Sequence, residues 1–549
     1  MAALTRHFKR IPARRPTCSK RYFPGCPDRL LIAPQDLRTA DPIIADDIYS
    51  GLYVFAGQVE NCKTRSPFMH QPPNREWARE LHGFRWLRHL SSSDRTVARA
   101  KAAALVEDWI KHSHRFGPEA WETSVVANRV LAWLNNSPLI LQDSDHDFYR
   151  AFLRALYLQV RYLRARYSSM PCNLDRLNLV IAELAGWLCF AGRERFVRLA
   201  SRRLEAELNE QILPDGGHAS RNPATIITVL LELLPLRQTF LSRDMVPPEG
   251  MSLAIERMMP MLRFFRHPNG SFAHFNGTGA TPADLLATIL AYDDIRGAPV
   301  SDASFSGYQR MEAGQSLLIM DTGDCPPLEQ SVQAHAGNLS FELSVGRAPI
   351  VINCGAPACQ LESWRELARS TAAHSTLTIQ DHSTYKISDQ CLDLGGKPLL
   401  GGTAKTVYER SLDQAQETIR AHHDCYEHPF GIRHCRQIWM AIDGRRLDGR
   451  DEMQSIGNGI RKGQDSFTLR FHLHPSVQVE MSDDGDLVYL GLANGEIWQF
   501  VSKEVDATIE ESVFLSDIHG IRPTTQLAIY GHASHVPTIN WYFERLARS

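Results

Sequence analysis

The chain has 549 residues, of which 43% are hydrophobic and 22% are charged, and these are the proportions of an ordinary globular protein. One hydrophobic core does not extend over this length, so we expect two or three domains. The 60 basic and 62 acidic residues nearly cancel to a net charge of −2, which gives no electrostatic case for a nucleic-acid partner. The eleven cysteines are scattered and contain no Cys-x-x-Cys pair, which argues against a disulfide framework or a cysteine-type zinc site.

The N-terminal segment is basic and rich in proline, and it lacks the apolar run of a signal peptide. Residues 1–35 therefore predict a disordered basic tail in preference to a targeting or membrane-surface segment. Taken at face value, the chain is cytoplasmic. No run of about 20 apolar residues, the length that a bilayer requires, appears in the sequence, so we expect no integral membrane segment.

A helical period then extends over residues 36–300. Apolar residues recur at helical spacing in eight segments, and short linkers with Gly, Pro, Ser or Asp separate most of them. The segments are residues 96–112, 121–134, 148–167, 174–191, 194–212, 225–241, 253–265 and 282–293. Helices of similar length in pairs predict an α/α bundle, toroid or solenoid.

Several of these segments combine aromatic and basic residues, such as Trp121 with Arg129. A tryptophan at helical spacing is usually a core residue. A concave helical surface with tryptophan and arginine would also suit an anionic sugar, because aromatic faces stack on pyranose rings and guanidinium groups bind carboxylates or sulfates. Trp121 and Arg129 are therefore candidate substrate-binding residues.

A loop between two of the predicted helices concentrates polar groups. Residues 213–223 read Leu-Pro-Asp-Gly-Gly-His-Ala-Ser-Arg-Asn-Pro, and Asp-Gly-Gly signals a tight turn. His218, Ser220, Arg221 and Asn222 follow the turn and could donate to an acidic ligand or polarise it. The alternative is a connecting turn whose polar groups cap the next helix.

The period changes near residue 306. Short strand-like runs separated by turn residues predict an antiparallel β-sandwich or stacked sheets over residues 306–549. These runs are residues 316–321, 339–345, 349–353, 375–379, 437–442, 467–472, 496–501 and 526–530. The predicted fold class is thus α+β multidomain, an N-terminal α/α toroid followed by a C-terminal antiparallel β-sandwich, with the boundary between residues 297 and 307.

Four segments in this order resemble the heparinase II/III-like polysaccharide lyases, a family that includes oligoalginate lyases. They are Asp-Gly-Gly-His-Ala-Ser-Arg-Asn-Pro at 215–223, Gln-Ala-His-Ala-Gly-Asn-Leu-Ser-Phe at 333–341, Arg-Ser-Thr-Ala-Ala-His-Ser-Thr at 369–376 and His-Asp-Cys-Tyr at 423–426. The Phe-His-Leu-His-Pro run at 471–475 also fits. The resemblance covers most of residues 70–540 and implies a toroid, a sandwich and an active cleft between them.

The resemblance implies β-elimination at a uronic acid. A base removes the proton beside the carboxylate, the glycosidic oxygen on the neighbouring carbon leaves, and an unsaturated sugar remains. The carboxylate must be neutralised to stabilise the enolate-like intermediate, and tyrosine or histidine serves as base and as acid. The implied partner is an acidic polysaccharide or oligosaccharide, and the reaction requires no cofactor. Such proteins suggest a periplasmic or cell-envelope location.

Carried over residue by residue, the resemblance assigns a catalytic set of His218, Tyr426 and Asn173. Asn173 would neutralise the carboxylate, although the same residue could serve as an N-cap. The chain departs from the family at three positions: Thr225 stands in place of a tyrosine, Gln333 in place of a histidine and Gly337 in place of an aspartate. Threonine is no general base near neutral pH without its own activator.

The remaining assignments concern substrate and metal. Arg221, Asn222 and Arg369 join Trp121 and Arg129 as candidate substrate-binding residues, although arginines in such loops often hold the loop itself. His335, Asn353 and His374 match positions that hold a structural zinc in some relatives. Imidazole suits zinc, and an asparagine in place of a carboxylate weakens such a site.

Three functions remain open on the sequence alone. The first is a polysaccharide lyase that cleaves a uronate-containing glycan. The second is a non-catalytic acidic-glycan-binding or cell-envelope protein that has lost the catalytic tyrosine. The third is a glycoside hydrolase, which would need two carboxylates facing each other, and Asp215 and Asp175 are the motif-linked candidates.

Overall fold

The structure is a computed structural model that describes residues 25–546, with gaps at 64, 93–94, 294–296, 358–361, 392–393, 414, 458 and 462. Most of the expected basic tail therefore lies outside the described residues. The chain divides into two compact units. A helical unit contains the chain up to Gln211 together with Thr228–Glu256 and Ala287–Tyr292, and a second unit contains Ile212–Ile227, Arg257–Leu286 and Asp293–Ser549.

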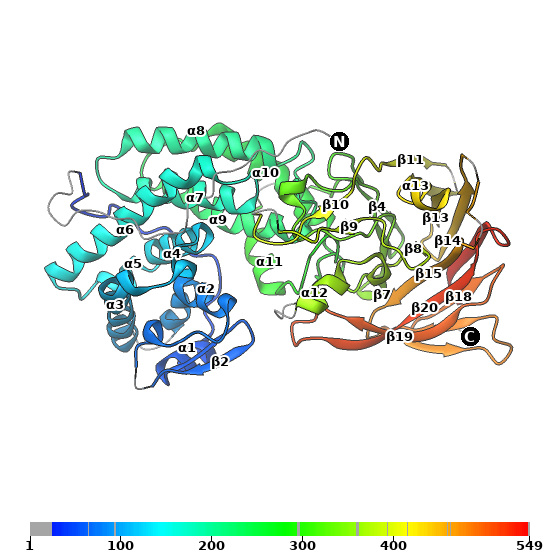
Figure 1. Cartoon of the computed structure of the whole chain (residues 1–549), viewed down its shortest axis with the longest axis horizontal. Coiled ribbons are helices and arrows are strands. Elements are labelled where there is room, and N and C mark those ends of the chain that lie inside the picture. The colour runs from blue at the N-terminus through cyan, green and yellow to red at the C-terminus, as the bar shows by residue number, and fades with distance from the viewer. Residues whose placement is uncertain are drawn as a thin grey trace. The chain divides into compact units, whose positions relative to one another are not determined.

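Helices make up most of the first unit (Figure 1). The α-helices in this part of the chain are α1 (Pro42–Tyr49), α2 (Arg75–Gly83), α3 (Arg95–His112), α4 (Thr123–Asn135), α5 (Ser137–Leu141), α6 (His146–Arg166), α7 (Leu174–Cys189), α8 (Glu194–Gln211), α9 (Pro223–Leu241), α10 (Glu249–Phe264) and α11 (Ala283–Leu290). Short 3-10 helices lie at Pro67–Met69, Arg85–Ser92, Ser113–Arg115, Pro118–Trp121 and Tyr167–Ser169.

The helix boundaries follow from side-chain caps and apolar faces. Asp145 precedes α6 and accepts the backbone N–H of Phe148 at 2.7 Å, while Asn173 precedes α7 and accepts that of Arg176 at 3.3 Å. Most of α7 is buried, because it packs against α4, α6 and α8. The helix α9 has the length and apolar composition of a membrane span, and 72% of its apolar window is buried within the protein, as in a core helix.

One hairpin in the helical unit was not expected from the sequence. The strands β1 (Leu52–Phe55) and β2 (Gln58–Asn61) pair in antiparallel register around a turn at Ala56 and Gly57, which both have positive φ angles. The helical period extends on both sides of this hairpin, and four residues per strand are too few to change the periodicity of a longer window.

Two antiparallel sheets dominate the second unit. The first has the order β11-β12-β13-β14-β21-β18-β17-β16, and the second has the order β19-β20-β15-β7-β6-β5-β4-β3, with β8 paired to β15. Their strands are β3 (Asp302–Ala303), β4 (Tyr308–Ala313), β5 (Ser316–Asp321), β6 (Phe341–Val345), β7 (Ala348–Ile352), β8 (Leu377–Ile379), β11 (Thr406–Leu412), β12 (Gln416–His423), β13 (Ile432–Ala441), β14 (Arg446–Ser455), β15 (Ser466–Leu473), β16 (Gln478–Met481), β17 (Val488–Gly491), β18 (Ile497–Ser502), β19 (Thr508–Phe514), β20 (Arg522–His532) and β21 (Thr538–Arg545).

Smaller elements complete this unit. A two-stranded ribbon pairs β9 (Lys386–Ile387) with β10 (Leu399–Leu400), and short helices lie at α12 (Glu362–Ala368), α13 (Glu427–Phe430), Leu328–Gln330 and Thr371–Ala373. The two large sheets share one apolar core. In it, Phe341 of β6 stacks on Trp541 of β21, with ring centroids 5.6 Å apart and an interplanar angle of 5°. The predicted fold class, helices followed by an antiparallel β-sandwich, is confirmed.

Candidate functional site

The polar loop at residues 213–223 is held by its turn and by the segment before β4. Gly216 has a φ of +90°, and a Cβ atom there would lie 1.9 Å from the carbonyl oxygen of Arg257, so only glycine fits. The carboxylate of Asp215 accepts the backbone N–H groups of Gly217 at 3.0 Å and Ser306 at 2.6 Å, and the Ser306 hydroxyl at 2.7 Å. These bonds occupy both oxygens of Asp215, one of the two carboxylates proposed for a hydrolase.

His218 is buried, with 2% of its surface exposed. The backbone N–H of Ser220 donates to its Nδ1 atom at 3.0 Å, and the Ser220 hydroxyl lies 2.8 Å from the same nitrogen. Because Nδ1 accepts the amide hydrogen, the proton of the neutral ring is on Nε2. Burial lowers the pKa of His218 to about 3, so the imidazole is neutral and a weak base at neutral pH.

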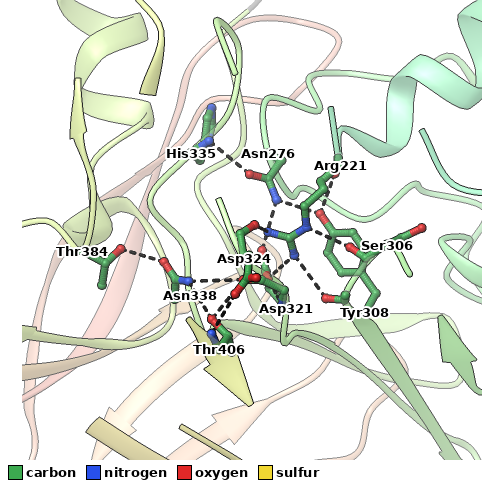
Figure 2. Close-up of polar contacts among 12 residues, drawn as sticks. Arg221, Asn276, Ser306, Tyr308, Asp321, Asp324, His335, Asn338, Thr384 and Thr406 are labelled. Atoms are coloured by element: carbon green, nitrogen blue, oxygen red, sulfur yellow. Dashed lines mark hydrogen bonds and ion pairs between the residues drawn. The ribbon is translucent and has the colours of Figure 1, made fainter. Parts of the chain in front are cut away.

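The side chain of Arg221 holds the loop against strand β5 (Figure 2). Its guanidinium donates to the carbonyl oxygens of Ser306 at 2.8 Å, Asp324 at 2.7 Å and Gly307 at 3.1 Å, and forms an ion pair with Asp321. Burial alone would lower the pKa of Arg221, but the negative charge of Asp321 raises it above its ordinary value, so the group stays charged. Through these contacts, the side chain of Arg221 holds the 213–223 loop in place.

A hydrogen-bond chain continues from this ion pair (Figure 2). The amide nitrogen of Asn276 donates to Asp321 at 3.1 Å and to the hydroxyl of Tyr308 at 2.7 Å. The amide oxygen of Asn276 accepts the backbone N–H of His335 at 3.2 Å. The loop, β5 and the segment around His335 therefore form one polar network, in which Arg221 and His335 were the site residues expected from the sequence.

Asn222 caps a helix. Its amide oxygen accepts the backbone N–H of Ala224, at the start of α9, at 2.9 Å, and it also accepts the hydroxyl of Thr278 at 3.0 Å. Its amide nitrogen donates to the side-chain oxygen of Gln333 at 3.3 Å. Thr225 lies three positions after Asn222, with its hydroxyl 3.4 Å from that of Ser220. Gln333, the residue that departs from the family histidine, thus serves as the acceptor for the cap residue.

His335 and His374 are buried and form a pair. The Nδ1 atom of His374 donates to the carbonyl oxygen of Ser370 at 2.8 Å, so its Nε2 atom accepts from Nδ1 of His335 at 3.2 Å. Burial lowers the pKa of His374 to about 4 and the pKa of His335 well below its ordinary value, so both rings are neutral. A Cβ atom at Gly337 would lie 2.7 Å from the His374 ring, which leaves no room for the family aspartate.

The donor set around this pair does not fit a closed structural zinc site. The separation of 3.2 Å is close to the roughly 3.3 Å between two nitrogen ligands of a tetrahedral zinc ion. The oxygen of Asn353, however, accepts the backbone N–H of Ser375 at 3.1 Å, and its amide nitrogen cannot bind a metal. Among the described residues, no group of three or more His, Cys, Asp or Glu side chains is placed to hold a metal ion.

Tyr426 lies in the sandwich core, with 1% of its surface exposed. Its hydroxyl donates to the carbonyl oxygens of His382 at 3.0 Å and Leu377 at 3.3 Å. Burial raises the pKa of Tyr426 above its ordinary value. A phenol that is dry, protonated and bonded to main-chain carbonyls has the surroundings of a core residue.

The other named residues are also in structural contacts. Arg369 donates to the carbonyl oxygens of Ala334 at 2.9 Å and Lys397 at 2.8 Å. In the helical unit Asn173 is the N-cap of α7, and Trp121 is buried. Arg129 is fully buried there and donates to Gln159 at 2.6 Å, with its guanidinium 4.1 Å above the ring centroid of Trp109.

A second polar cluster was not expected from the sequence. Glu342 of β6 is buried between His267, whose Nε2 atom lies 3.0 Å from the carboxylate, and His274, whose Nδ1 atom lies 3.3 Å from it. The two histidines hold the pKa of Glu342 far below its usual range, against the effect of burial. A cavity of about 180 Å³ borders the cluster, with His474 and Ser516 also in its wall. In the sequence, Glu342 lies within the strand-like run of residues 339–345, so no pattern marked it as a candidate functional residue.

The arrangement as a whole favours rigidity over proton transfer. A general acid or base works best when its pKa lies near the operating pH, and burial moves His218 and Tyr426 away from it in opposite directions. Main-chain carbonyl groups are hydrogen-bonded to the guanidinium groups of Arg221 and Arg369. The described contacts of these residues position backbone segments.

The chain is similar to a known family model and to a known protein. A sequence model of the heparinase II/III-like C-terminal domain matches residues 295–542. FtsZ-localized protein C of Caulobacter vibrioides is 28% identical over 505 residues, which are 90% of this chain and 86% of that protein.

Solved structures of lyases share the fold. Heparinase III aligns with a TM-score of 0.71 at 15% identity, over 90% of this chain and 80% of that chain. The heparan sulfate lyase HepC of Pedobacter heparinus aligns with a TM-score of 0.62 at 15% identity, over 93% and 84% of the two chains. At this identity the likeness concerns the fold, an α/α toroid followed by a β-sandwich.

Proposed function

We propose that this protein, whose C-terminal domain belongs to the heparinase II/III-like family, localises with FtsZ and uses the lyase fold without performing β-elimination. The loss of catalysis belongs to the second function left open by the sequence, a non-catalytic acidic-glycan-binding or cell-envelope protein, and the location with FtsZ is added from the relative in Caulobacter vibrioides. The name of that relative states where it is found, and the alignment covers 90% of this chain.

The observation that carries the proposal is the position of Tyr426. With the family tyrosine replaced by Thr225, Tyr426 was the remaining tyrosine to transfer a proton. Its hydroxyl is directed at the carbonyl oxygens of Leu377 and His382 inside the sandwich core, and 1% of its surface is exposed. A catalytic acid or base must reach the substrate atom within hydrogen-bond distance, which a core residue does not do.

The other departures from the family support the same conclusion. Gln333 accepts a hydrogen bond from the helix-capping Asn222, and the position of Gly337 against His374 has no room for a side chain. Each substituted residue is therefore integrated into a packed, hydrogen-bonded arrangement, as expected for a branch that has kept the scaffold after losing the chemistry.

The alternative is the lyase activity of the family. The match over residues 295–542 and the retained Asp-Gly-Gly-His loop favour it. In that case the protein would abstract the proton beside the carboxylate of a uronate and expel the glycosidic oxygen, and the product would carry a C=C bond conjugated to the carboxylate.

One measurement separates the two functions. The purified chain is incubated with heparan sulfate, chondroitin, alginate, polyglucuronate and crude envelope glycan, and the ultraviolet absorbance of the conjugated C=C bond is followed. We expect no increase above a boiled sample. A reproducible increase with any polymer establishes β-elimination, identifies the substrate class and overturns the non-catalytic assignment.

A second measurement tests the location. A fluorescent fusion of the chain is expressed in Caulobacter vibrioides together with labelled FtsZ. We expect the two signals to coincide, and the fusion to become diffuse when FtsZ is depleted. A diffuse signal in cells with normal FtsZ contradicts the proposal, provided that immunoblotting shows an intact fusion.

A further inference from the structure

Four arginines and two apolar side chains line a hollow on the helical unit. The hollow lies where α6 meets α8 and has a volume of about 380 Å³. We call it the arginine hollow. Its wall consists of Arg164, Arg195, Phe196, Arg198, Leu199 and Arg202. This wall contains no carboxylate, although the whole chain has a net charge of −2.

The sequence of α8 places these residues together. Arg198, Leu199 and Arg202 lie three, four and seven residues after Arg195, so the four residues share one face of the helix. The three arginines of α8 are exposed, and 37% of the Leu199 surface is exposed as well. The face is therefore positive at both ends with an apolar residue between.

The arginines of the arginine hollow form no close ion pair, although Arg164 is attracted to the buried carboxylate of Glu183. Other arginines of the same unit form ion pairs with buried carboxylates, as Arg176 does with Glu207 at 2.9 Å and Arg203 with Glu183 at 3.0 Å. Arg164, Arg195, Arg198 and Arg202 form no such pair with any residue that the structure describes. The like charges of Arg195, Arg198 and Arg202 at helical spacing on α8 repel one another, and an anionic ligand would relieve this repulsion.

The aromatic ring at the hollow is covered on both faces. Phe196 stacks on Trp187, with ring centroids 4.7 Å apart, and the guanidinium of Arg164 lies 4.7 Å from its centroid. A sugar or a nucleic-acid base would need an open aromatic face for stacking. A membrane surface would need protruding apolar side chains, whereas here the apolar residues lie in a hollow.

We propose that the arginine hollow binds an acidic peptide segment of a partner protein. Guanidinium groups form paired hydrogen bonds with carboxylates, and Leu199 offers an apolar contact between them. Seven residues of α8 span about 10 Å from Arg195 to Arg202, and a peptide in the polyproline II conformation covers about this distance in one turn of three residues, which returns the side chain to the same face. The segment that fits has two carboxylates about three positions apart, with an apolar side chain between them.

The test uses the full chain and a fluorescein-labelled peptide of the repeat Glu-Leu-Ser, followed by fluorescence anisotropy. Two further peptides carry glutamine in place of glutamate, or serine in place of leucine. Heparin and phosphatidylglycerol vesicles are measured directly as the other polyanions. The variants are Arg198→Glu with Arg202→Glu, Leu199→Ser, and a matched control that reverses two exposed arginines of the second unit, Arg347→Glu with Arg420→Glu.

We expect the glutamate peptide to bind the wild-type chain and the control variant equally within twofold. We expect at least tenfold weaker binding with the Arg198/Arg202 variant or with the glutamine peptide, and weaker binding with Leu199→Ser or the serine peptide. Binding should also weaken with salt, since the contacts are exposed charges. A melting temperature equal to that of the wild type shows that the variants fold.

Three results overturn the proposal. The first is no peptide binding by the folded wild type. The second is equal weakening by the control variant, which indicates attraction without a site. The third is binding of heparin or vesicles that depends on Arg198 and Arg202 when the peptide does not bind, which assigns the hollow to a polysaccharide or a lipid surface.

Discussion

Arg221 in the 213–223 loop and Asp321 at the end of β5 form a buried ion pair across a sequence separation of 100 residues, with side-chain exposures of 8% and 3%. The carbonyl oxygens of Ser306, Gly307 and Asp324 satisfy the remaining guanidinium donors. A buried charge whose partner is removed is left without compensation, so this pair couples the loop strongly to the sheet.

We predict that Asp321→Asn lowers the free energy of unfolding by about 3–5 kcal/mol, because it leaves the buried guanidinium of Arg221 unpaired. Arg221→Lys should also destabilise, since an ammonium group cannot reproduce the planar fork of hydrogen bonds. Urea unfolding measures both, with the exposed Arg347→Lys as the control. A loss below 1 kcal/mol for Asp321→Asn contradicts the role assigned to the pair.

Gly216→Ala should destabilise the protein by roughly 2–4 kcal/mol, because the added Cβ atom overlaps the carbonyl oxygen of Arg257 and the φ angle is positive. The matched control is Gly495→Ala. Gly495 has a φ of +80° and open space around its Cβ position, so only the conformational penalty of about 1–2 kcal/mol remains. Equal losses in the two variants, measured by chemical unfolding, contradict the steric account.

Acid should unfold this protein through its buried histidines. The pKa of His218 is lowered to about 3 in the folded state, so the unfolded chain binds a proton between about pH 6.5 and 3 that the folded chain does not. Stability therefore falls as pH falls through this window, by up to about 1.4 kcal/mol per pH unit for each such histidine. His374 and His472 contribute in the same direction.

The variant His218→Asn tests this linkage. At pH 5 the slope of the unfolding free energy against pH should decrease by about one proton, because asparagine does not titrate and can still accept the Ser220 N–H. His146→Asn is the control, since the His146 side chain is 81% exposed, and it should leave the slope unchanged. A slope for His218→Asn equal to that of the wild type removes His218 from the acid response.

Replacement of Tyr426 by phenylalanine distinguishes a core residue from a catalytic one. The change removes the donor to the carbonyl oxygens of Leu377 and His382, so we expect a loss of about 1–3 kcal/mol in unfolding free energy. FtsZ co-localisation should be unchanged at a temperature where the variant is folded. Loss of a uronate-cleaving activity with unchanged stability is the opposite outcome and assigns the hydroxyl to catalysis.

The histidine pair makes a prediction about zinc. We expect less than about 0.1 zinc ion per purified chain, because His335 and His374 lack a third anionic ligand. Asn353→Asp supplies a carboxylate at the position where the family resemblance expects one, and it should bring zinc binding close to one ion per chain. Metal analysis after dialysis measures both, and Asn353→Asp with His374→Ala is the control. Stoichiometric zinc in the wild-type chain contradicts this interpretation of the donor set.

The sequence alone determined the helical and β halves of the chain and about half of their elements. Residues 316–321 were predicted as a strand and form β5, and residues 194–212 were predicted as a helix and form α8 (Glu194–Gln211). Periodicity succeeds here because burial of one face imposes a local pattern, 3.6 residues for a helix and two for a strand. The β1–β2 hairpin was missed because its strands are shorter than the window in which a period can be detected.

The tertiary structure alone decided what the polar residues do. Arg221 has the same covalent structure whether it clamps a substrate carboxylate or Asp321, which lies 100 residues away in the chain. Tyr426 in a His-Asp-Cys-Tyr segment could face a cleft or a core, and the backbone carbonyls that receive its hydroxyl come from residues 377 and 382. Burial and hydrogen-bond partners are set by packing between segments that lie far apart in the chain. The local sequence around a residue does not determine which of these segments it will contact.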